Sequence, residues 1–382
     1  MAERRKVGLI YKYNENWIGG IYYIQNLVSA LNLLPDVEKP ILNVYIDSEE
    51  HFNELANLTN YPYLYKKKYG KFRRGIIKIS RAVFGKLIPG LFSSDIHDIV
   101  FPAAREYLFS SKQTFLYWIP DFQEHYLPHF FKPDELKSRK EYQNNLVRNA
   151  KHLILSSTAA QKNFNDIYPT NRLTQHVLRF AVSHNMPRCT DEDIHVKYKI
   201  PGEYFICSNQ FWIHKNHKVI LEAIRLLKNR NVSVFVAFTG KEYDNRNPEY
   251  FSQLKVLASN LDVQDNIKFL GFISREDQIT LMKKALAVLQ PSLFEGWSTL
   301  IEDAKAIKQS IIASEILVHQ EQLQDYNLKV LFPVDDAFQL AKCMEENLKK
   351  LPKRPHDYNY ENNVLEFGRN FINIVDKIRN RN

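Results

Sequence analysis

Short runs of β-forming residues alternate with amphipathic helical stretches along the whole chain, and this alternation constrains the fold more than any other feature. Runs with strand character occur at 7–11, 41–46, 98–102, 114–119, 152–156, 176–180, 204–208, 232–239, 267–272, 285–290, 310–314 and 329–334. Apolar residues at helical spacing lie between these runs, at 21–34, 217–228, 248–259, 275–285 and 299–307. Such alternation is typical of parallel sheets that are covered by helices.

The number of strands indicates two domains. Twelve strands exceed one compact sheet but fit two six-stranded, doubly wound sheets, and 382 residues suffice for two domains. The polar stretch 184–200 favours a linker. We therefore predict an α/β fold in which two Rossmann-like domains, at 1–183 and 201–360, face each other across a cleft. The segment 361–382 should form a last helix, at 361–378, that packs back toward the first domain through its apolar stripe.

The composition excludes several classes of protein. A chain with 45% hydrophobic residues can bury a core and is not disordered as a whole. No uncharged apolar run approaches the roughly 18 residues of a membrane-spanning helix, and the first ten residues do not resemble a signal peptide. Cys189, Cys207 and Cys343 are widely separated, so we expect no disulfide framework, no zinc site built on cysteine pairs and a cytoplasmic location.

The net positive charge is concentrated in one segment, 65–86. This segment holds nine Lys and Arg residues and no acid, whereas the rest of the chain holds 43 basic and 43 acidic residues. Its apolar residues recur at near-helical spacing, and a basic amphipathic helix is typical of binding to an anionic membrane. A solvated loop is an equally weighted interpretation. We expect no nucleic-acid binding, because no nucleic-acid motif accompanies the charge. The candidate residues for membrane or acceptor-lipid contact are Lys66, Lys67, Lys68, Arg73 and Arg74.

Loops that join a strand to the following helix are the candidate sites, since ligands bind beyond the carboxyl ends of strands in open parallel sheets. The first such loop ends in Gly19 and Gly20, where the backbone could approach a ligand closely or simply make a tight turn. A second loop places Lys215 directly before a helix, where its charge could neutralise a leaving diphosphate. His214 and His217 have H-x-x-H spacing but no evident third ligand, so we expect no metal there.

The third loop, with the sequence FEGWST, follows the strand at 285–290 and opens a helix. Gly296 would let backbone N–H groups turn toward a ligand. Thr299 and Glu302 have the spacing of a capping box, which predicts a structural role for Glu302. Asp303 points about 100° away around the helix and should be free to meet a ligand. Glu295 and Asp303 could then accept hydrogen bonds from the vicinal diols of a ligand that carries both phosphate and hydroxyls.

At this third loop the chain resembles glycosyltransferase family 4, whose members are retaining enzymes with the GT-B fold. The segment FEGWSTLIEDAKA resembles the family's E-x7-E motif, with Glu295 as the first acid and Asp303 in place of the second. The segment SNQFWIHKNH resembles the family's diphosphate-binding loop, with Lys215 on the family's lysine and Gln210 where an arginine is often found. The resemblance extends from residue 6 to about residue 345.

Three further segments carry the resemblance. Gly271 to Ile273 resembles the turn whose backbone reads the nucleotide base, and Gly19-Gly20 matches the glycine loop of the N-terminal domain. Asp121 lies in a stretch, ending at Pro128, that resembles the family's H-D…P stretch near the acceptor, with Pro120 where the histidine often stands.

The resemblance implies a metal-independent glycosyltransferase without a cofactor, in which a nucleotide-sugar is the co-substrate. The acceptor would be a glycan or a lipid-linked glycan, in the synthesis of a surface polysaccharide at the inner face of a membrane. The implied catalytic residues are Glu295, Lys215 and Asp121. The implied donor-binding residues are Gly19, Gly20, Asn209, Gln210, Lys215, Gly271, Phe272, Ile273, Glu295, Gly296, Trp297, Ser298, Thr299 and Asp303.

Within the implied site, Glu295 would contact the sugar, Asp303 the ribose, and Lys215 with the N–H groups at 297–299 the diphosphate. The D-x-D spelling at 191–193 is interpreted as solvated linker. The alternatives are another GT-B activity, such as an epimerase or a phosphorylase, and a catalytically silent partner that binds sugar or lipid. The donor sugar, the base, the acceptor, the linkage and the oligomeric state stay open.

Overall fold

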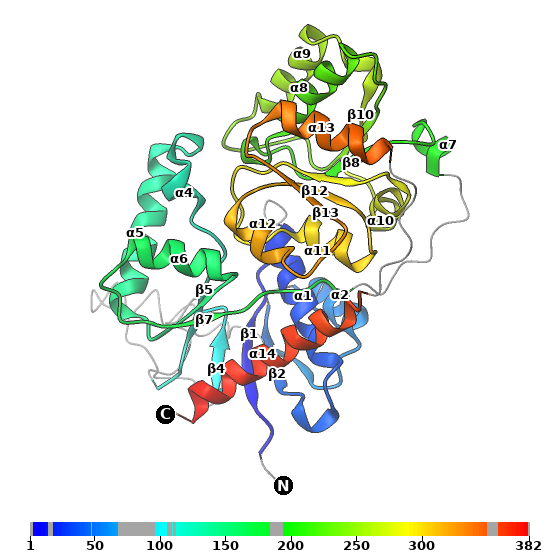
Figure 1. Ribbon diagram of the computed structural model, residues 1–382. Helices are drawn as coiled ribbons and strands as arrows, with labels where there is room; N and C mark the ends of the chain where they lie inside the picture. Colours follow the sequence, from blue (N-terminus) through cyan, green and yellow to red (C-terminus); the bar gives the residue numbers. More distant parts are fainter. Residues whose placement is uncertain are drawn as a thin grey trace. The chain divides into compact units, whose positions relative to one another are not determined.

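A computed structural model of the chain divides into two compact units (Figure 1). Unit 1 comprises Met1–Pro120, Tyr142–Ser183 and Glu361–Asn382, and unit 2 comprises Asp121–Glu141 and His184–Tyr360. The predicted domain 1–183 contained the segment Asp121–Glu141, which the structure groups with unit 2. The residues that the structure describes are 3–13, 18–46, 48–67, 96–104, 109, 112–183, 194–349 and 358–380.

Unit 1 is built on two parallel sheets. The first has the strand order β3-β2-β1-β4, with β1 at Lys6–Ile10, β2 at Ile41–Tyr45, β3 at Leu64–Lys67 and β4 at Ile99–Phe101. The second has the order β5-β6-β7, with strands at Leu116–Ile119, His152–Leu155 and Thr174–Val177. A parallel bridge between Val100 and Phe115 connects the two sheets. The helices of this unit are α1 (Ile18–Asn32), α2 (Glu49–Thr59), α6 (Thr158–Ile167) and α14 (Glu361–Arg379), and α5 (Pro133–Asn149) passes into it from unit 2.

Unit 2 contains one six-stranded parallel sheet with the order β10-β9-β8-β11-β12-β13. Its strands are Phe205–Ser208 (β8), Val236–Thr239 (β9), Ile267–Phe269 (β10), Val288–Gln290 (β11), Ile311–Ser314 (β12) and Lys329–Phe332 (β13). Its helices are α4 (Gln123–Tyr126), α7 (Ile194–Tyr198), α8 (His217–Lys228), α9 (Tyr250–Asn260), α10 (Arg275–Lys284), α11 (Thr299–Ala306), α12 (Leu317–Gln322) and α13 (Ala337–Leu348). The order is that of a doubly wound Rossmann sheet.

The two faces of the unit 2 sheet are buried under different helices. Successive strand residues point to opposite faces, so Phe205 joins the cluster formed with α8, α9 and α13, whereas Ile206 joins the cluster formed with α10 and α11. A strand buried on both faces has few polar positions, which explains why its apolar run is visible in the sequence.

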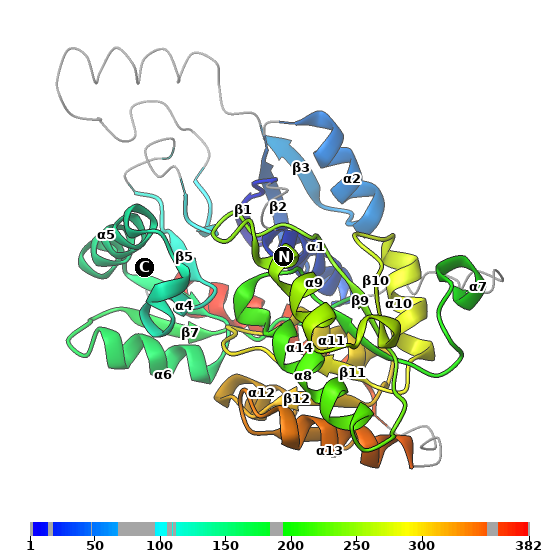
Figure 2. The ribbon, with the colours of Figure 1, turned by 90° about the horizontal axis from the view of Figure 1, so that it is seen from above.

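All twelve predicted strands are present, and unit 2 has the six strands that the sequence predicts. The prediction of six strands for the first domain is wrong, because unit 1 has seven strands among the residues that the structure describes. The additional strand is β3, which lies at the edge of its sheet beside α2 (Figure 2). Its sequence, LYKK, does not predict a strand, because lysine has a low strand propensity. Lysine is nevertheless a usual residue on exposed edge strands.

Lys66 and Lys67 therefore lie in β3 and not in a basic helix. The Lys66 ammonium pairs with the Glu49 carboxylate at the start of α2, and only 12% of its side chain is exposed. It also lies 5.9 Å from the centre of the Phe52 ring. The remaining candidates for membrane contact, Lys68, Arg73 and Arg74, lie outside the described residues.

Helix α14 packs within unit 1 although it follows all of unit 2 in the sequence. It contacts α1 so closely that a Cβ atom on Gly368 would lie 2.8 Å from the Ala30 carbonyl oxygen. The Phe371 ring packs against the Phe101 ring, and the Asp376 carboxylate accepts two hydrogen bonds from Arg5. The apolar stripe of α14 is thus buried against the elements that begin the chain.

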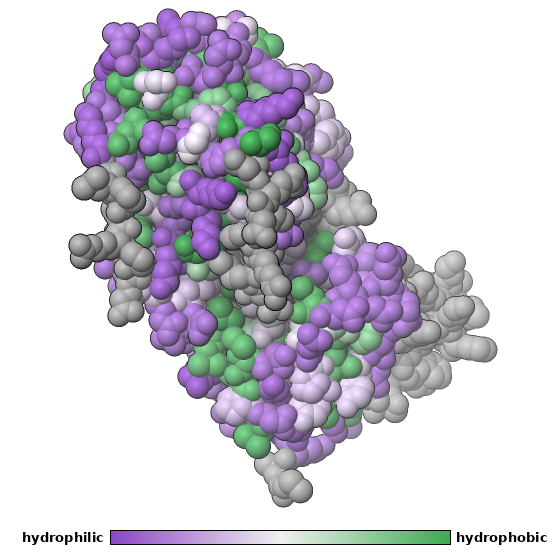
Figure 3. Space-filling model, turned by 90° about the vertical axis from the view of Figure 1, so that its right-hand side faces the viewer, coloured by the Kyte–Doolittle hydropathy of each residue, from purple (hydrophilic) through white to green (hydrophobic). Residues whose placement is uncertain are grey.

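The surface shown in Figure 3 is mainly hydrophilic, with hydrophobic residues scattered in small groups. Among the residues that the structure describes, no helix has the length and apolar character needed to cross a membrane.

Candidate active site

The loops after β8 and β11 carry the two residues on which the predicted chemistry depends. These strands are parallel neighbours, with Ile206 opposite Val288. From β8 the chain continues to β9 and β10 on one side, and from β11 it continues to β12 and β13 on the other. Two loops that leave the carboxyl ends of adjacent strands in opposite directions form the usual ligand position in such sheets. The short 3-10 helix Ile213–Lys215 and the loop before α11 occupy this position.

The structure brings Lys215 and Glu295 together as an ion pair. The Lys215 Nζ lies 2.5 Å from the Glu295 Oε1, and only 14% and 9% of the two side chains are exposed. The same carboxylate oxygen accepts hydrogen bonds from the Ser292 hydroxyl at 2.7 Å and from the Gln290 amide at 3.0 Å. Because the pair is largely removed from water, the loss of either partner would leave a charge without compensation.

Gln290 connects several predicted donor-binding residues, a role that no motif in the sequence indicates. Its Nε2 lies 3.0 Å from the Ser298 hydroxyl oxygen as well as from Glu295, and its Oε1 accepts a hydrogen bond from Asn209 at 2.7 Å. Gln290 is the last residue of β11, and its side chain is fully buried. It therefore holds the ends of β8 and β11 and the start of α11 in one network.

The capping box expected from Thr299 and Glu302 is wrong. Ser298 is the N-cap of α11, and its hydroxyl accepts a hydrogen bond from the Ile301 N–H. The Ser298 N–H donates to the Gln322 side chain at 3.0 Å, so this predicted phosphate donor is already engaged in the structure.

Glu302 lies instead in a buried polar network. Its Oε1 accepts hydrogen bonds from Lys305 at 3.0 Å and from Gln322 at 2.8 Å, and its Oε2 accepts one from the Tyr360 hydroxyl at 2.6 Å. Burial opposes the charge of Lys305, but the Glu302 carboxylate outweighs it and the pKa of Lys305 is raised. Both side chains are almost fully buried, so the role of Glu302 is structural, but by a different mechanism from the predicted one.

Asp303 is not free to meet a ligand as the sequence predicted. It is buried, and its Oδ1 accepts a hydrogen bond from Arg275 at the start of α10. Arg275 also donates to Gln278, whose amide donates in turn to the Ser208 hydroxyl at the end of β8. A ribose that used Asp303 would have to share this carboxylate with Arg275.

The predicted glycine sites, Gly271 and the pair Gly19-Gly20, differ in their local structure. Gly271 has φ of +68°, a conformation that a residue with a side chain rarely adopts, and its carbonyl accepts hydrogen bonds from Gly240 and Thr239. The next residue, Phe272, is exposed, and Ile273 packs at the edge of the core. Gly19 and Gly20 lie in unit 1, where they form the first turn of α1 and not the loop before it.

Asp121 begins the segment of unit 2 that contains α4. Burial raises the pKa of its carboxyl, and the nearby charges of Glu124 and Glu295 act in the same direction, whereas the hydrogen bond from the Gln123 N–H and the Arg139 charge oppose them. The structure therefore places the third predicted catalytic residue within electrostatic reach of Glu295.

A buried arginine that sequence reasoning missed supports the Lys215 loop. Arg246 donates to Gln123 at 2.7 Å, lies 3.3 Å from the Asp244 carboxylate and approaches the His214 ring at 3.5 Å. Asp244 in turn accepts a hydrogen bond from the Ile213 N–H. Burial, followed by the charges of Lys215 and Arg246, holds the pKa of His214 well below its usual value. The residue before Lys215 is thus a neutral imidazole in a fixed position.

The two histidines of the H-x-x-H spacing are both buried. His217 is buried against the Phe211 ring, with ring centres 4.6 Å apart, and burial lowers its pKa to about 3. No group of three or more His, Cys, Asp or Glu side chains is placed to hold a metal ion in the part of the chain that the structure describes. The D-x-D spelling at 191–193 lies outside that part.

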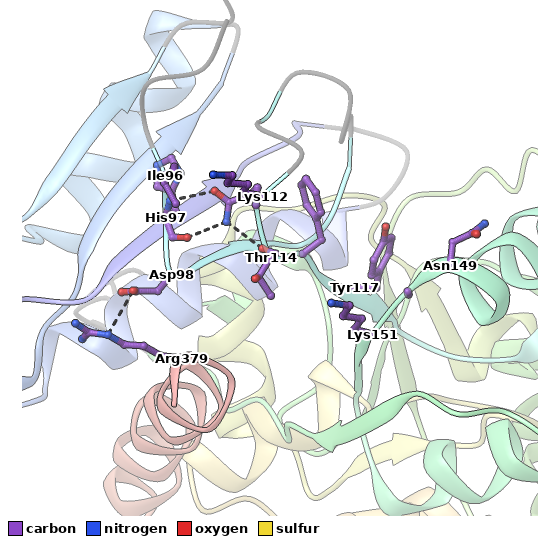
Figure 4. A pocket seen from close by; sticks show the side chains of 12 residues that line it. Ile96, His97, Asp98, Lys112, Thr114, Tyr117, Asn149, Lys151 and Arg379 are labelled. Atoms are coloured by element: carbon purple, nitrogen blue, oxygen red, sulfur yellow. Dashed lines mark hydrogen bonds and ion pairs between the residues drawn. The ribbon is translucent and has the colours of Figure 1, made fainter. Parts of the chain in front are cut away.

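Unit 1 has a hollow of about 550 Å³ at the amino ends of its strands (Figure 4). Residues that precede β4, β5 and β6 line it, together with the last turn of α14. The Gln113 side chain bonds the backbone of His97 and Thr114, and Arg379 pairs with Asp98 at 3.5 Å. Ligands of open parallel sheets bind at the opposite ends of the strands, so this hollow is distinct from the candidate active site.

Comparison with known proteins gives two kinds of likeness. A family model for group 1 glycosyl transferases matches residues 190–363. The O-antigen chain mannosyltransferase RfbU of Salmonella typhimurium is 26% identical over 158 residues, which span 41% of this chain and 41% of that protein. The matched part thus covers about two fifths of the length of this relative.

Solved structures match over nearly the whole chain. A glycosyltransferase from Rickettsia africae superposes with a TM-score of 0.67 at 15% identity, covering 98% of both chains. HepE of Anabaena, solved in complex with UDP and glucose, superposes with a TM-score of 0.63 at 13% identity, covering 99% of this chain and 98% of that one. These likenesses confirm the predicted GT-B fold class.

Proposed function

We propose that the chain, of which residues 190–363 match the family model for group 1 glycosyl transferases, is a retaining glycosyltransferase. It moves a sugar from a nucleotide-sugar to a glycan or lipid-linked glycan in the synthesis of a surface polysaccharide. The observation that carries the proposal is the Lys215–Glu295 pair, held between the carboxyl ends of β8 and β11. An ammonium there suits a diphosphate and a carboxylate suits sugar hydroxyls.

In the proposed reaction, an acceptor hydroxyl attacks the anomeric carbon on the face from which the diphosphate departs. The bond from the anomeric carbon to the acceptor oxygen forms as its bond to the phosphate oxygen breaks, and the hydroxyl proton passes to that phosphate oxygen. Lys215 neutralises the charge that develops on the leaving group, and Glu295 accepts hydrogen bonds from the donor sugar. The step uses no metal ion and no cofactor.

The proposal includes further donor contacts. Asp303 would accept from the ribose diol while it keeps its contact with Arg275. The exposed turn at Gly271–Ile273 would present backbone groups to the base. The backbone N–H groups of Trp297 and Thr299, at the start of α11, would bind phosphate oxygens, since a helix start carries partial positive charge.

The test is a screen of the protein against UDP-, GDP- and dTDP-sugars. A true donor stabilises the folded state by about 2.7 kcal/mol at a concentration 100 times its Kd, and thermal unfolding detects the increase as a higher Tm. The same donor should be cleaved to the nucleoside diphosphate, slowly in water and faster with acceptor. The absence of both a shift in Tm and cleavage with every donor would refute the proposal. Conversion of the donor to its epimer would favour an epimerase.

We further propose peripheral association with the inner face of a membrane through the basic segment 65–86. Its support is the concentration of nine cations in one stretch, each contributing about 1 kcal/mol near an anionic surface. Since Lys66 is paired within unit 1, the relevant change is the triple replacement of Lys68, Arg73 and Arg74 by Gln. We expect it to weaken co-sedimentation with anionic liposomes about 100-fold in partition coefficient at low salt.

The matched control is the triple replacement of Lys283, Lys284 and Lys342 by Gln, which removes the same charge from exposed positions of unit 2. It should change the partition coefficient much less. If the wild type does not pellet with anionic liposomes at low salt, or if both triple variants lose binding equally, the basic segment is not the membrane contact.

A further inference from the structure

An aromatic pair joins the Glu295 loop to the segment that contains Asp121. The Tyr126 ring, at the end of α4, stacks on the Phe294 ring with centres 5.3 Å apart and planes inclined by 23°. Although it packs on Phe294, Tyr126 leaves 44% of its surface exposed. Tyrosine presents a flat apolar face with a polar tip, which suits a ligand that is apolar on one face and polar at its rim.

The position of this pair relates it to the proposed chemistry. Phe294 directly precedes Glu295, the residue proposed to hold the donor sugar. Asp121, two residues before α4, feels the charge of Glu295. A molecule resting on Tyr126 would therefore lie beside the sugar that Glu295 is proposed to hold, and an acceptor hydroxyl has to reach that sugar.

The two segments are held together by contacts other than the stacking itself. Gln123 of α4 accepts a hydrogen bond from Arg246, and the Arg246 guanidinium lies 4.8 Å from the centre of the Phe131 ring. Arg246 also contacts His214 beside Lys215. The aromatic pair is thus attached to the same network as the proposed diphosphate contact, and its geometry does not depend on the stacked rings alone.

The chemistry of a pyranose fits this surface. The axial C–H bonds on one face of such a ring make that face apolar, while the hydroxyl groups project around its edge. The C–H face can pack on an aromatic ring, and the hydroxyl edge can reach nearby carboxylates, which accept hydrogen bonds. A binding site that combines an aromatic wall with a few polar groups is the usual design for a small polar ligand.

We propose that Tyr126, backed by Phe294, forms the binding subsite for the acceptor, and that the acceptor is bound there through a pyranose ring stacked on the tyrosine. The proposal rests on the proposed glycosyl transfer and adds the place and the chemical class of the accepting group. Tyr126 binds this sugar and Asp121 lies at its hydroxyl edge.

The first experiment measures binding directly. Saturation-transfer difference NMR is recorded with the methyl α- and β-pyranosides of glucose, galactose and mannose, in the presence of the nucleoside diphosphate whose sugar raises the Tm. We expect at least one glycoside to receive saturation mainly at the protons of one ring face, and Tyr126→Ala to reduce this transfer about fivefold or more. The absence of transfer to every glycoside with the wild-type protein would overturn the proposal.

The second experiment compares Michaelis constants, with the octyl glycosides of the same sugars as acceptors and release of nucleoside diphosphate above the hydrolysis rate as the signal. Tyr126→Ala and Tyr126→Leu should raise the KM for the acceptor about five- to tenfold, and Tyr126→Phe should raise it less than twofold. The KM for the donor should change less than twofold in all three variants. Tyr142→Ala is the matched control, because Tyr142 is an exposed tyrosine of similar accessibility, 49%, on α5.

Each other outcome has a definite meaning. A rise in the donor KM would show that Tyr126 stacks on the nucleotide, and a fall in kcat with both KM values unchanged would show that it only positions Glu295. Either result overturns the proposal. Failure of the proposed function is recognised separately, since a wild-type protein that neither binds nor hydrolyses any nucleotide-sugar is not a glycosyltransferase.

Discussion

Replacement of Lys215 by alanine is expected to lower kcat for sugar transfer about 100-fold, which corresponds to roughly 3 kcal/mol of lost transition-state stabilisation. The physical reason is that negative charge builds up on the diphosphate as it leaves, and under the proposal the Lys215 ammonium, in the loop after β8, neutralises this charge. The effect should appear in kcat more than in the donor KM, because the charge on the leaving oxygen is largest in the transition state.

Replacement of Glu295, the ion-pair partner of Lys215, is also expected to lower kcat. The Lys215 ammonium is bound to Glu295, so a diphosphate that binds Lys215 must share this ammonium with the carboxylate or replace it. Glu295→Gln should also lower kcat by one to two orders of magnitude, because a neutral amide accepts hydrogen bonds from sugar hydroxyls less strongly than a carboxylate does. The double variant should lose little more than the worse single variant, since the two residues act as a unit.

The matched control for Lys215 is Lys218→Ala on the adjoining helix α8. Lys218 is 56% exposed and pairs with Glu222 at 3.3 Å, so its removal should leave turnover within twofold of the wild type. Circular dichroism spectra and thermal unfolding establish that each variant is folded. Turnover by Lys215→Ala close to that of the wild type would exclude the diphosphate role.

Replacement of Glu302 by alanine is expected to lower the free energy of unfolding by about 3–5 kcal/mol. The change removes a carboxylate that accepts hydrogen bonds from Lys305, Gln322 and Tyr360. It also leaves the buried Lys305 ammonium without its counter-ion, which is the main cost of breaking a buried pair. The midpoint of urea denaturation, followed by circular dichroism, measures the loss.

Two further variants test whether Glu302 stabilises the protein through its buried ion pair or as a helix cap. Combining Glu302→Leu with Lys305→Met should recover most of the stability, because replacing both members of a buried pair by apolar residues is often neutral. Glu346→Ala, which removes an exposed glutamate from α13 of the same unit, should change the unfolding free energy by less than about 0.5 kcal/mol. A loss of only about 1 kcal/mol in Glu302→Ala would instead indicate the weaker contribution of a helix cap.

The sequence predicts unit 2 well because its strands are buried on both faces and therefore appear as continuous apolar runs. β8 and β11 were found in this way, and a helix was correctly expected after each of them. β3 was missed because its lysines serve an edge strand, where one side is open to solvent. The start of α11 at Thr299 was expected correctly, but its N-cap was misplaced by one residue because Ser298 and Thr299 are both good N-caps, and packing around Gln322 decides between them.

The candidate site also contains residues that the sequence predicts and residues that only the structure reveals. Lys215 and Glu295 could be proposed because they stand in loops that join a strand to a helix, and Asp121 because its stretch resembles that of a known family. The residues that hold them come from elsewhere in the chain. Arg275 pairs with Asp303 from a different helix, and Arg246 reaches the Lys215 loop from a polar stretch without any motif. Such partners are chosen by tertiary packing, which local spacing does not record.

The late position of α14 in the chain has a consequence for biosynthesis. Most of unit 2, His184–Tyr360, is translated between the first elements of unit 1 and the helix that covers them. At about 5–20 residues per second, the α1 and β4 surfaces that receive Gly368 and Phe371 stay uncovered on the ribosome for on the order of ten seconds or longer. Unit 2 can therefore complete its sheet before unit 1 is complete. Unit 1 is completed only when α14, at the end of the chain, packs on the elements that were translated first.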